Sequence, residues 1–146
     1  MTQYSDVLVA TDGSAPASHA AAHAVSLADA HGATLHVLYV VETRTGYDNA
    51  IVDPEIVRTR LHEEGSEATD AVAEEARARG LDVVTAIEAG VPPDEILAYV
   101  ADHDVDVVVM GAQGRSAFKT ALLGSTTEAV LSRADVPVLV VGRGDD

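Results

Sequence analysis

Short apolar segments rich in β-branched residues alternate with alanine-rich segments along this chain of 146 residues. The apolar segments predict five β-strands, at residues 5–10, 34–41, 81–88, 105–110 and 136–141. The segments between them predict four helices, at residues 16–31, 54–79, 93–102 and 124–133. Strands that strictly alternate with helices need crossover connections, which make the strands parallel and place helices on both faces of the sheet. The sequence therefore predicts an α/β fold with a doubly wound, five-stranded parallel sheet.

Length and composition favour one globular domain. A chain of 146 residues with 47% hydrophobic residues suits a single domain spanning residues 1–146. No apolar run approaches the ~20 residues of a membrane span, and residues 1–30 lack the pattern of a secretory signal, so we expect a cytoplasmic protein with no membrane partner. The absence of cysteine excludes disulfides, thiol catalysis and cysteine-based metal sites.

The charge is strongly acidic, with 24 acidic and 9 basic residues and a formal net charge of −15. Nucleic acids and anionic membranes need a cationic face, so we expect neither as a partner. One interpretation is an ordinary soluble acidic protein. The other is adaptation to a high-salt cytoplasm, because the Debye length falls to ~3 Å at 1 M salt and self-repulsion is then screened. The presence of a single lysine, Lys119, favours the second interpretation.

The last predicted strand contains a proline, Pro137. Proline cannot donate to a β-ladder, so this strand is predicted to lie at an edge of the sheet. An apolar edge can pair with a second copy. We therefore predict a homodimer; the alternative is an edge covered by loops. The predicted interface residues are Pro137, Val138, Leu139, Val140 and Val141.

Ligands of doubly wound sheets bind outside the carboxyl ends of the strands, where the strand order reverses. The first strand runs into the sequence ATDGS at residues 10–14, and the fourth runs into MGAQGRS at residues 110–116. The latter opens the spacing Gly111-x2-Gly114-x9-Gly124-Ser125, and glycines let a backbone approach phosphate oxygens.

A helix begins where this glycine-rich loop ends. Ser125, Thr126 and Thr127 would offer amides, hydroxyls and the positive end of a helix dipole to an anion. Residues 107–127 contain no acidic residue but include Arg115 and Lys119, so they form the most credible binding site for a polyanion in this acidic chain. The alternative is a tight turn in which Ser125 is only a helix N-cap.

These residues resemble the universal stress protein family of the UspA type. The resemblance rests on Asp12-Gly13-Ser14, on Gly90-x-Pro92, and on the run from residue 110 to residue 141, and it covers essentially the whole chain. The glycine spacing of the fourth-strand loop is similar to that of the family's ATP-binding branch. The resemblance implies a sheet of order 3-2-1-4-5, of the adenine nucleotide alpha hydrolase-like type, and dimers that pair the fifth strands.

The resemblance also implies roles for individual residues. Asp12 would accept hydrogen bonds from the ribose hydroxyls of ATP, and Val40 would contact adenine through its backbone. Mg²⁺ or Mn²⁺ would bridge phosphate oxygens, with no protein side chain assigned to the metal. The residues implied in nucleotide binding are Ala10 and Thr11 at the adenine, Met110 at the end of the fourth strand, and Gly111, Gly114, Arg115, Gly124, Ser125 and Thr126 around the phosphates. An Asp before Gly at a strand end is otherwise a common turn residue.

Three other clusters are interpreted as structural. His19 and His23 share a helix face but have no third ligand nearby, so they are predicted to be solvated surface. The sequence Asp102-His103-Asp104 precedes the fourth strand, at the opposite end of the sheet from the predicted site, and is assigned to a helix terminus. The acidic run at residues 63–75 is most simply interpreted as the solvent-exposed face of a helix.

No catalytic motif is present. The sequence lacks a Gly-x-Ser-x-Gly elbow, a P-loop and a Gly-x-Gly-x-x-Gly after the first strand. We therefore predict an ATP-binding stress-response or signalling module without efficient catalysis. The alternative is a nucleotide-free dimeric scaffold that acts through protein contacts. An adenine-nucleotide-dependent enzyme of a related fold ranks last, because residues 11–14 do not supply its Ser-Gly-Gly-x-x-Ser loop.

Overall fold

The computed structural model of the chain describes residues 3–42, 54–113 and 123–142. The strands are β1 (Asp6–Thr11), β2 (Thr34–Glu42), β3 (Val83–Gly90), β4 (Val107–Gly111) and β5 (Val138–Val141). The helices are α1 (Ala15–His31), α2 (Pro54–Ala78), α3 (Pro92–Asp102) and α4 (Ser125–Arg133). The strands form one parallel sheet of order β3-β2-β1-β4-β5, which confirms the predicted fold and strand order.

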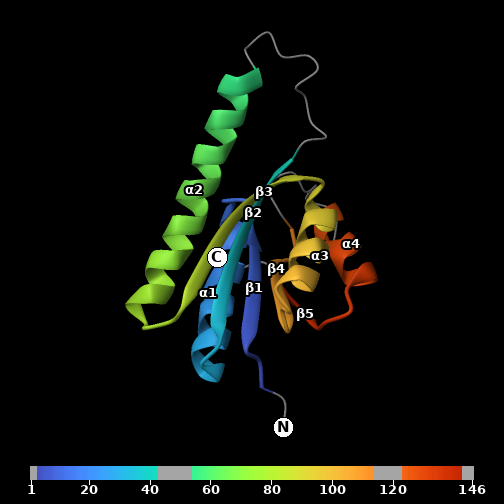
Figure 1. The fold of residues 1–146 in the computed structure, drawn as a ribbon. Helices are drawn as coiled ribbons and strands as arrows, with labels where there is room; N and C mark the ends of the chain where they lie inside the picture. Colours follow the sequence, from blue (N-terminus) through green and yellow to red (C-terminus); the bar gives the residue numbers. More distant parts are fainter. Residues whose placement is uncertain (1–2, 43–53, 114–122, 143–146) are drawn as a thin grey trace.

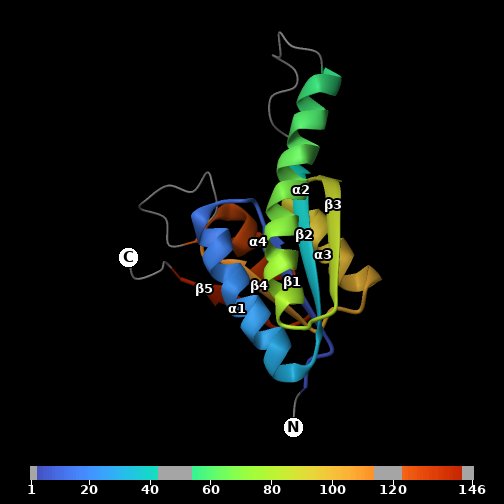
Figure 2. The ribbon, with the colours of Figure 1, turned by 90° about the vertical axis from the view of Figure 1, so that its left-hand side faces the viewer.

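The helices cover both faces of the sheet. Helices α1 and α2 lie on one face and helices α3 and α4 on the other (Figures 1 and 2). Alternate residues of β1 point to opposite faces: Val7 and Val9 pack in the core beneath α1 and α2, whereas Leu8 packs in the core beneath α3 and α4. The strands of the middle of the sheet are buried on both faces, which explains their nearly continuous apolar sequences.

Three strands begin two residues later than predicted. Helix ends occupy the backbone N–H groups that precede two of them, and a proline precedes the third. Leu81 donates its N–H to Ala76 at the end of α2, so β3 begins at Val83. Val105 donates its N–H to Val100 at the end of α3, so β4 begins at Val107. The prediction that Pro137 lies within the last strand is wrong: this residue has no N–H, and β5 begins after it at Val138.

Strand β5 forms one edge of the sheet, as predicted, because among the described strands it pairs with β4 alone. The carbonyl oxygens of Pro137 and Val141 accept hydrogen bonds from β4 and the residue that follows it. Since alternate residues of a parallel strand bond to opposite sides, Val138 and Val140 direct their backbone N–H and C=O groups toward the open edge.

Helix α2 contains a buried glycine, Gly65, that lies against the ring of Tyr39 in β2. A Cβ atom at residue 65 would lie 2.7 Å from Cδ1 of Tyr39, which is closer than real contacts allow. The sheet and the helix can therefore approach each other at this point only because residue 65 has no side chain.

We expect Gly65→Ala to lower the free energy of unfolding by up to about 2 kcal/mol, since overpacking costs ~1–3 kcal/mol and the gain in helix propensity offsets ~1 kcal/mol of it. Urea denaturation measures the change. In a Tyr39→Leu background the same substitution is expected to be neutral or stabilising. An equal loss in both backgrounds would contradict this packing account.

A polar cluster lies at the amino end of the sheet, away from the predicted site. His36 of β2 is buried and bonds through Nε2 to Oδ1 of Asp6 (2.9 Å) and through Nδ1 to the hydroxyl of Tyr99 (2.7 Å). The ring of His103 stacks on Tyr99 with centroids 3.8 Å apart, and His103 is the C-cap of α3. The helix-terminus role predicted for residues 102–104 is confirmed. The bonds of His36 were not predicted, because they join residues that lie far apart in sequence.

Burial raises the pKa of Tyr99 above its ordinary value, and the negative charges of Glu88 and Asp6 raise it further. As the pH rises, the Tyr99 hydroxyl of the unfolded chain therefore loses its proton before that of the folded protein. The contribution of protonated Tyr99 to the free energy of unfolding is lost as the pH rises above about 10. At pH 8, Tyr99→Phe should cost roughly 1–3 kcal/mol because His36 loses a buried partner. Urea unfolding at pH 8 and pH 11 should show this difference shrinking at the higher pH, and a constant difference would contradict the assignment.

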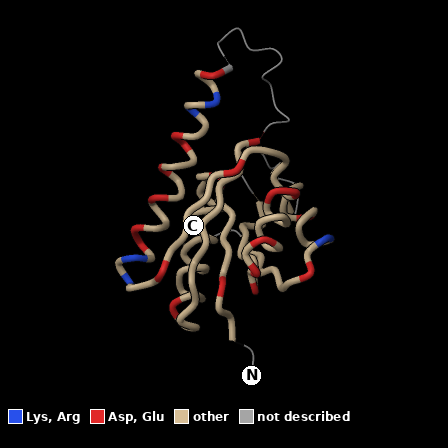
Figure 3. Tube along the Cα trace, viewed as in Figure 1, with Lys and Arg blue, Asp and Glu red and all other residues tan. Residues whose placement is uncertain are grey.

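The surface carries mostly negative charge, and Figure 3 shows acidic positions distributed along α2. The acidic side chains at residues 63–75 are exposed or half-buried, which confirms their interpretation as a solvated face. Within the described ranges the arginines lie on α2, on α4 and at Arg79, which directly follows α2. Two exposed ion pairs, Arg79–Asp29 (3.7 Å) and Arg133–Asp94 (2.8 Å), each join segments on one face of the sheet. Among the described helices, none is both long and apolar enough to cross a membrane.

Candidate functional site

The two predicted loops follow neighbouring strands, β1 and β4, at the reversal of the strand order. Pairing of β1 with β2 continues to Thr11–Tyr39, but pairing of β1 with β4 ends at Val9–Val109. The last two residues of β1 and the last two of β4 are therefore not paired with each other. This is the position at which parallel α/β sheets bind ligands.

The turn after β1 is held by its own side chains. Thr11 accepts the N–H of Gly13 on Oγ1 (3.1 Å), and Asp12 accepts the N–H of Ser14 on Oδ1 (2.9 Å). Gly13 has a φ of 79°, in the left-handed region that favours glycine. Ser14 then caps α1 by accepting the N–H of Ala17. Asp12 is thus a turn residue, and since a carboxylate can accept several hydrogen bonds, this role is compatible with the predicted one.

The end of β4 meets the start of α1 at Gly111. A Cβ atom at this residue would lie 3.1 Å from the carbonyl oxygen of Pro16 and 3.2 Å from that of Gln113. Both are backbone atoms, which cannot swing away as the end of a side chain can. Glycine at residue 111 therefore allows the end of β4 to approach the first turn of α1.

Among the described residues, no side chain caps the start of helix α4. Its N-cap is Gly124, so the alternative that Ser125 is the N-cap is wrong, and Ser125 is instead the exposed first residue of the helix. Thr126 is half-buried. Thr127 is buried and donates its hydroxyl to the carbonyl of Gly111 (2.8 Å), so the expectation that this hydroxyl is offered to an anion is wrong.

The remaining residues predicted to bind the nucleotide differ in how deeply they are buried. Ala10 and Val40 are half-buried and pack against the core beneath α3 and α4. Met110 is buried in that core, which leaves only its backbone for a ligand. Gly114, Arg115 and Lys119 lie outside the described residues, so their predicted roles stay predictions.

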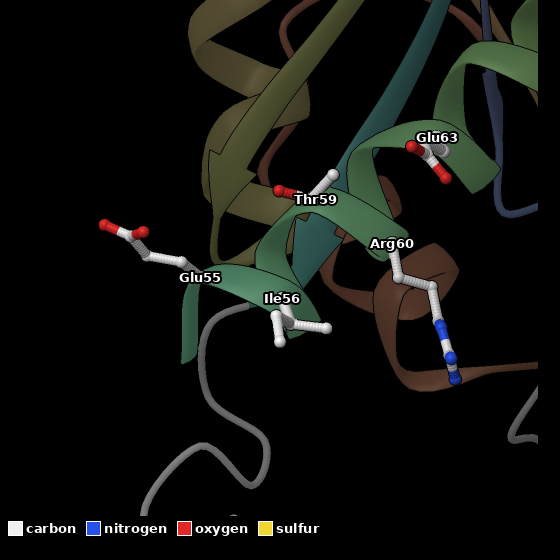
Figure 4. Close-up of a pocket in the computed structure, with 5 residues that line it drawn as sticks. All are labelled: Glu55, Ile56, Thr59, Arg60 and Glu63. Carbon is white, nitrogen blue, oxygen red and sulfur yellow. The ribbon is translucent and has the colours of Figure 1, made fainter. Parts of the chain in front are cut away.

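Two other features lie apart from these loops. His19 and His23 are exposed on α1 with ring centroids 5.2 Å apart, and no group of three or more potential metal ligands is found among the described residues. A hollow of about 420 Å³ lies beside the first turns of α2. Figure 4 shows that its lining side chains come from one helix and point in different directions, so they cannot enclose a ligand; they are Glu55, Ile56, Thr59, Arg60 and Glu63.

The sequence model of the universal stress protein family matches residues 3–142. The chain belongs to this family. Universal stress protein MJ0531 of Methanocaldococcus jannaschii is 34% identical over 139 residues, which cover 94% of this chain and 82% of the relative. The solved structure of MJ0577 from the same organism superposes with a TM-score of 0.88 at 29% identity, over 99% of this chain and 100% of the other.

Two solved structures with lower identity were determined with nucleotides. One is a universal stress protein in complex with cAMP, with a TM-score of 0.74 and 24% identity over 96% of this chain and 98% of the other. The second is the universal stress protein from Archaeoglobus fulgidus in complex with dAMP, with a TM-score of 0.66 and 22% identity over 96% and 99%. Both share the fold of this universal stress protein.

Proposed function

We propose that this universal stress protein binds ATP at the β1–β4 reversal and acts as a nucleotide-dependent stress-response or signalling module. The observation that carries the proposal is the approach of Gly111, at the end of β4, to Pro16 in the first turn of α1, because that turn directly follows the Asp12 segment in which the sequence predicts the ribose contact. The uncapped first turn of α4 at the same place suits an anion. The cAMP and dAMP complexes of two proteins with the same fold support an adenine nucleotide as the ligand class.

Each end of the nucleotide would have its own partners. Asp12 would accept hydrogen bonds from the ribose hydroxyls, beside an adenine that contacts Val40 through its backbone. When bound, Mg²⁺ or Mn²⁺ would neutralise part of the phosphate charge. The adenine would also lie against Ala10 and Thr11, and the nucleotide would contact the backbone of Met110. The phosphates would lie against Gly111, Gly114, Arg115, Gly124, Ser125 and Thr126.

Efficient hydrolysis is not part of the proposal. Phosphoryl transfer to water needs a group that positions or deprotonates the water. Asp12 is the acid that the sequence places at this edge, and its carboxylate already holds the turn through Ser14. We therefore propose binding without efficient turnover, so that any switching acts through the different affinities of two protein states for ATP.

The proposal is tested by denaturing the purified protein and separating the supernatant by nucleotide chromatography. We expect an adenine nucleotide in an amount comparable to the protein. A nucleotide-free supernatant, combined with a failure of the refolded or desalted protein to take up ATP, would reject the proposal.

We further propose that β5 pairs with β5 of a second copy in a homodimer. The edge is apolar, and the side chain of Leu139 is 41% exposed. Val138 and Val140 direct their backbone polar groups toward the open edge, and such groups favour another strand. The same edge would serve the alternative function, a nucleotide-free dimeric scaffold, which the chromatography distinguishes.

We expect Val140→Pro to convert the dimer into a monomer, because it removes an N–H that faces the open edge while β4 keeps its own partners. Size-exclusion chromatography with light scattering measures the mass. Circular dichroism should give a wild-type spectrum for the variant. A dimer of unchanged stability would show that the copies associate elsewhere.

We also propose that the protein works in a cytoplasm of high salt. The net charge of −15 supports this proposal, since a charge of this size opposes compaction unless it is screened.

A further inference from the structure

The hydroxyl of Thr127 bonds to a strand rather than to its own helix. Thr127 is the third residue of α4 and is 4% exposed, and its Oγ1 donates to the carbonyl oxygen of Gly111 at 2.8 Å. Gly111 is the last residue of β4, sixteen positions earlier in the chain. This bond joins the first turn of α4 directly to the carboxyl end of the sheet.

Two backbone bonds complete the connection. The N–H of Gly124 donates to the carbonyl of Ala112 at 2.7 Å, and the N–H of Ala112 donates to the carbonyl of Val141 in β5 at 2.8 Å. The peptide group between Gly111 and Ala112 therefore bonds to two elements. Its C=O accepts a hydrogen bond from α4, and its N–H donates one to β5. The hydroxyl of Thr127 is the side-chain contribution to this arrangement.

We propose that Thr127 is a positioning residue for the phosphates of the nucleotide, an inference that rests on the proposed function. Its hydroxyl fixes the first turn of α4, with its uncapped amides, at a set position relative to Gly111. Amides that are held in place before the anion arrives bind it without a further cost of ordering. The hydroxyl of Thr127 does not donate to the ligand, because its proton is committed to the carbonyl of Gly111.

The position of this bond predicts which part of the ligand is affected. The first turn of α4 faces the phosphates, whereas Asp12 and Val40 serve the nucleoside. Loss of the Thr127 hydroxyl should therefore weaken the binding of ATP and leave the binding of adenosine unchanged. A general loss of structure would weaken both ligands equally.

The test compares Thr127→Val, which keeps the shape and removes the hydroxyl, with Thr127→Ser, which keeps the hydroxyl, by calorimetry with ATP and with adenosine. We expect Thr127→Val to weaken ATP at least ~fivefold, from the typical strength of one buried hydrogen bond, and to change adenosine less than ~twofold. Thr127→Ser should bind ATP within about twofold of the wild type.

Several results would overturn the inference. They are unchanged ATP affinity in Thr127→Val, an equal loss for adenosine, or a Thr127→Ser variant as weak as Thr127→Val. If Thr127→Val does not fold, Thr127→Ala replaces it, and failure of both to fold would show that Thr127 serves the fold alone. A wild-type protein that binds adenosine or nothing, but not ATP, would instead reject the proposed function on which the inference rests.

Discussion

Asp12→Ala is expected to weaken the binding of ATP at least tenfold, which corresponds to ~1.4 kcal/mol. The proposed role of the carboxylate is to accept hydrogen bonds from the ribose, and hydrogen bonds to charged groups typically contribute about 1.5–3 kcal/mol. Isothermal titration calorimetry with ATP measures the change. An affinity equal to that of the wild type would remove Asp12 from the site.

Asp12→Asn separates the two roles of this residue. Oδ1 of Asp12 accepts the N–H of Ser14, and an asparagine can make the same bond with its amide oxygen. The turn, and with it the melting temperature, should therefore stay near that of the wild type in Asp12→Asn. Its amide group has no charge and only one acceptor oxygen, which the turn uses, so ATP binding should still fall about tenfold. Full affinity in Asp12→Asn would mean that the residue serves the turn alone.

Salt is expected to change the stability of the whole protein. With a net charge of −15 the folded chain repels itself, and this repulsion is screened over ~3 Å at 1 M salt but over ~10 Å at 0.1 M. We expect a rise from 0.1 M to 2 M KCl to increase the melting temperature by roughly 5–10 °C, or about 2–3 kcal/mol for a domain of this size. Thermal denaturation followed by circular dichroism measures the change.

A variant with a less acidic α2 provides the matched control. Glu67, Asp70 and Glu74 are exposed on this helix, and their replacement by Gln, Asn and Gln removes three of the 24 acidic residues. The variant should depend less on salt than the wild type. A wild-type protein with full stability in dilute buffer would count against adaptation to high salt.

The fold was largely predictable because its signals are local. The alternation of apolar and alanine-rich segments predicts every described strand and helix, and Gly32 ends α1 in the left-handed conformation that a helix-terminating glycine favours. The late starts of β3 and β4 arise because the N–H groups of Leu81 and Val105 bond to the ends of the preceding helices instead of joining the sheet. Such competition between helix and sheet for one N–H depends on the path of the chain in space.

The candidate site was predictable in part. The glycines and the Asp-Gly-Ser turn stand out because each has a local conformational purpose, as the φ of Gly13 illustrates. The hydroxyl of Thr127 was expected to face a ligand but bonds to Gly111, and the contact of His36 with Asp6 and Tyr99 was not predicted at all. Each of these bonds joins residues that only the assembled sheet brings together.

The most direct test of the central claim, that the loops after β1 and β4 form an ATP site, is calorimetric titration of the nucleotide-free protein with ATP in high-salt buffer. The account predicts saturable binding of one ATP per chain in the wild type and at least ~tenfold weaker binding in Asp12→Ala. A wild-type protein that gives no heat beyond dilution at any ATP concentration, while remaining folded, would contradict it.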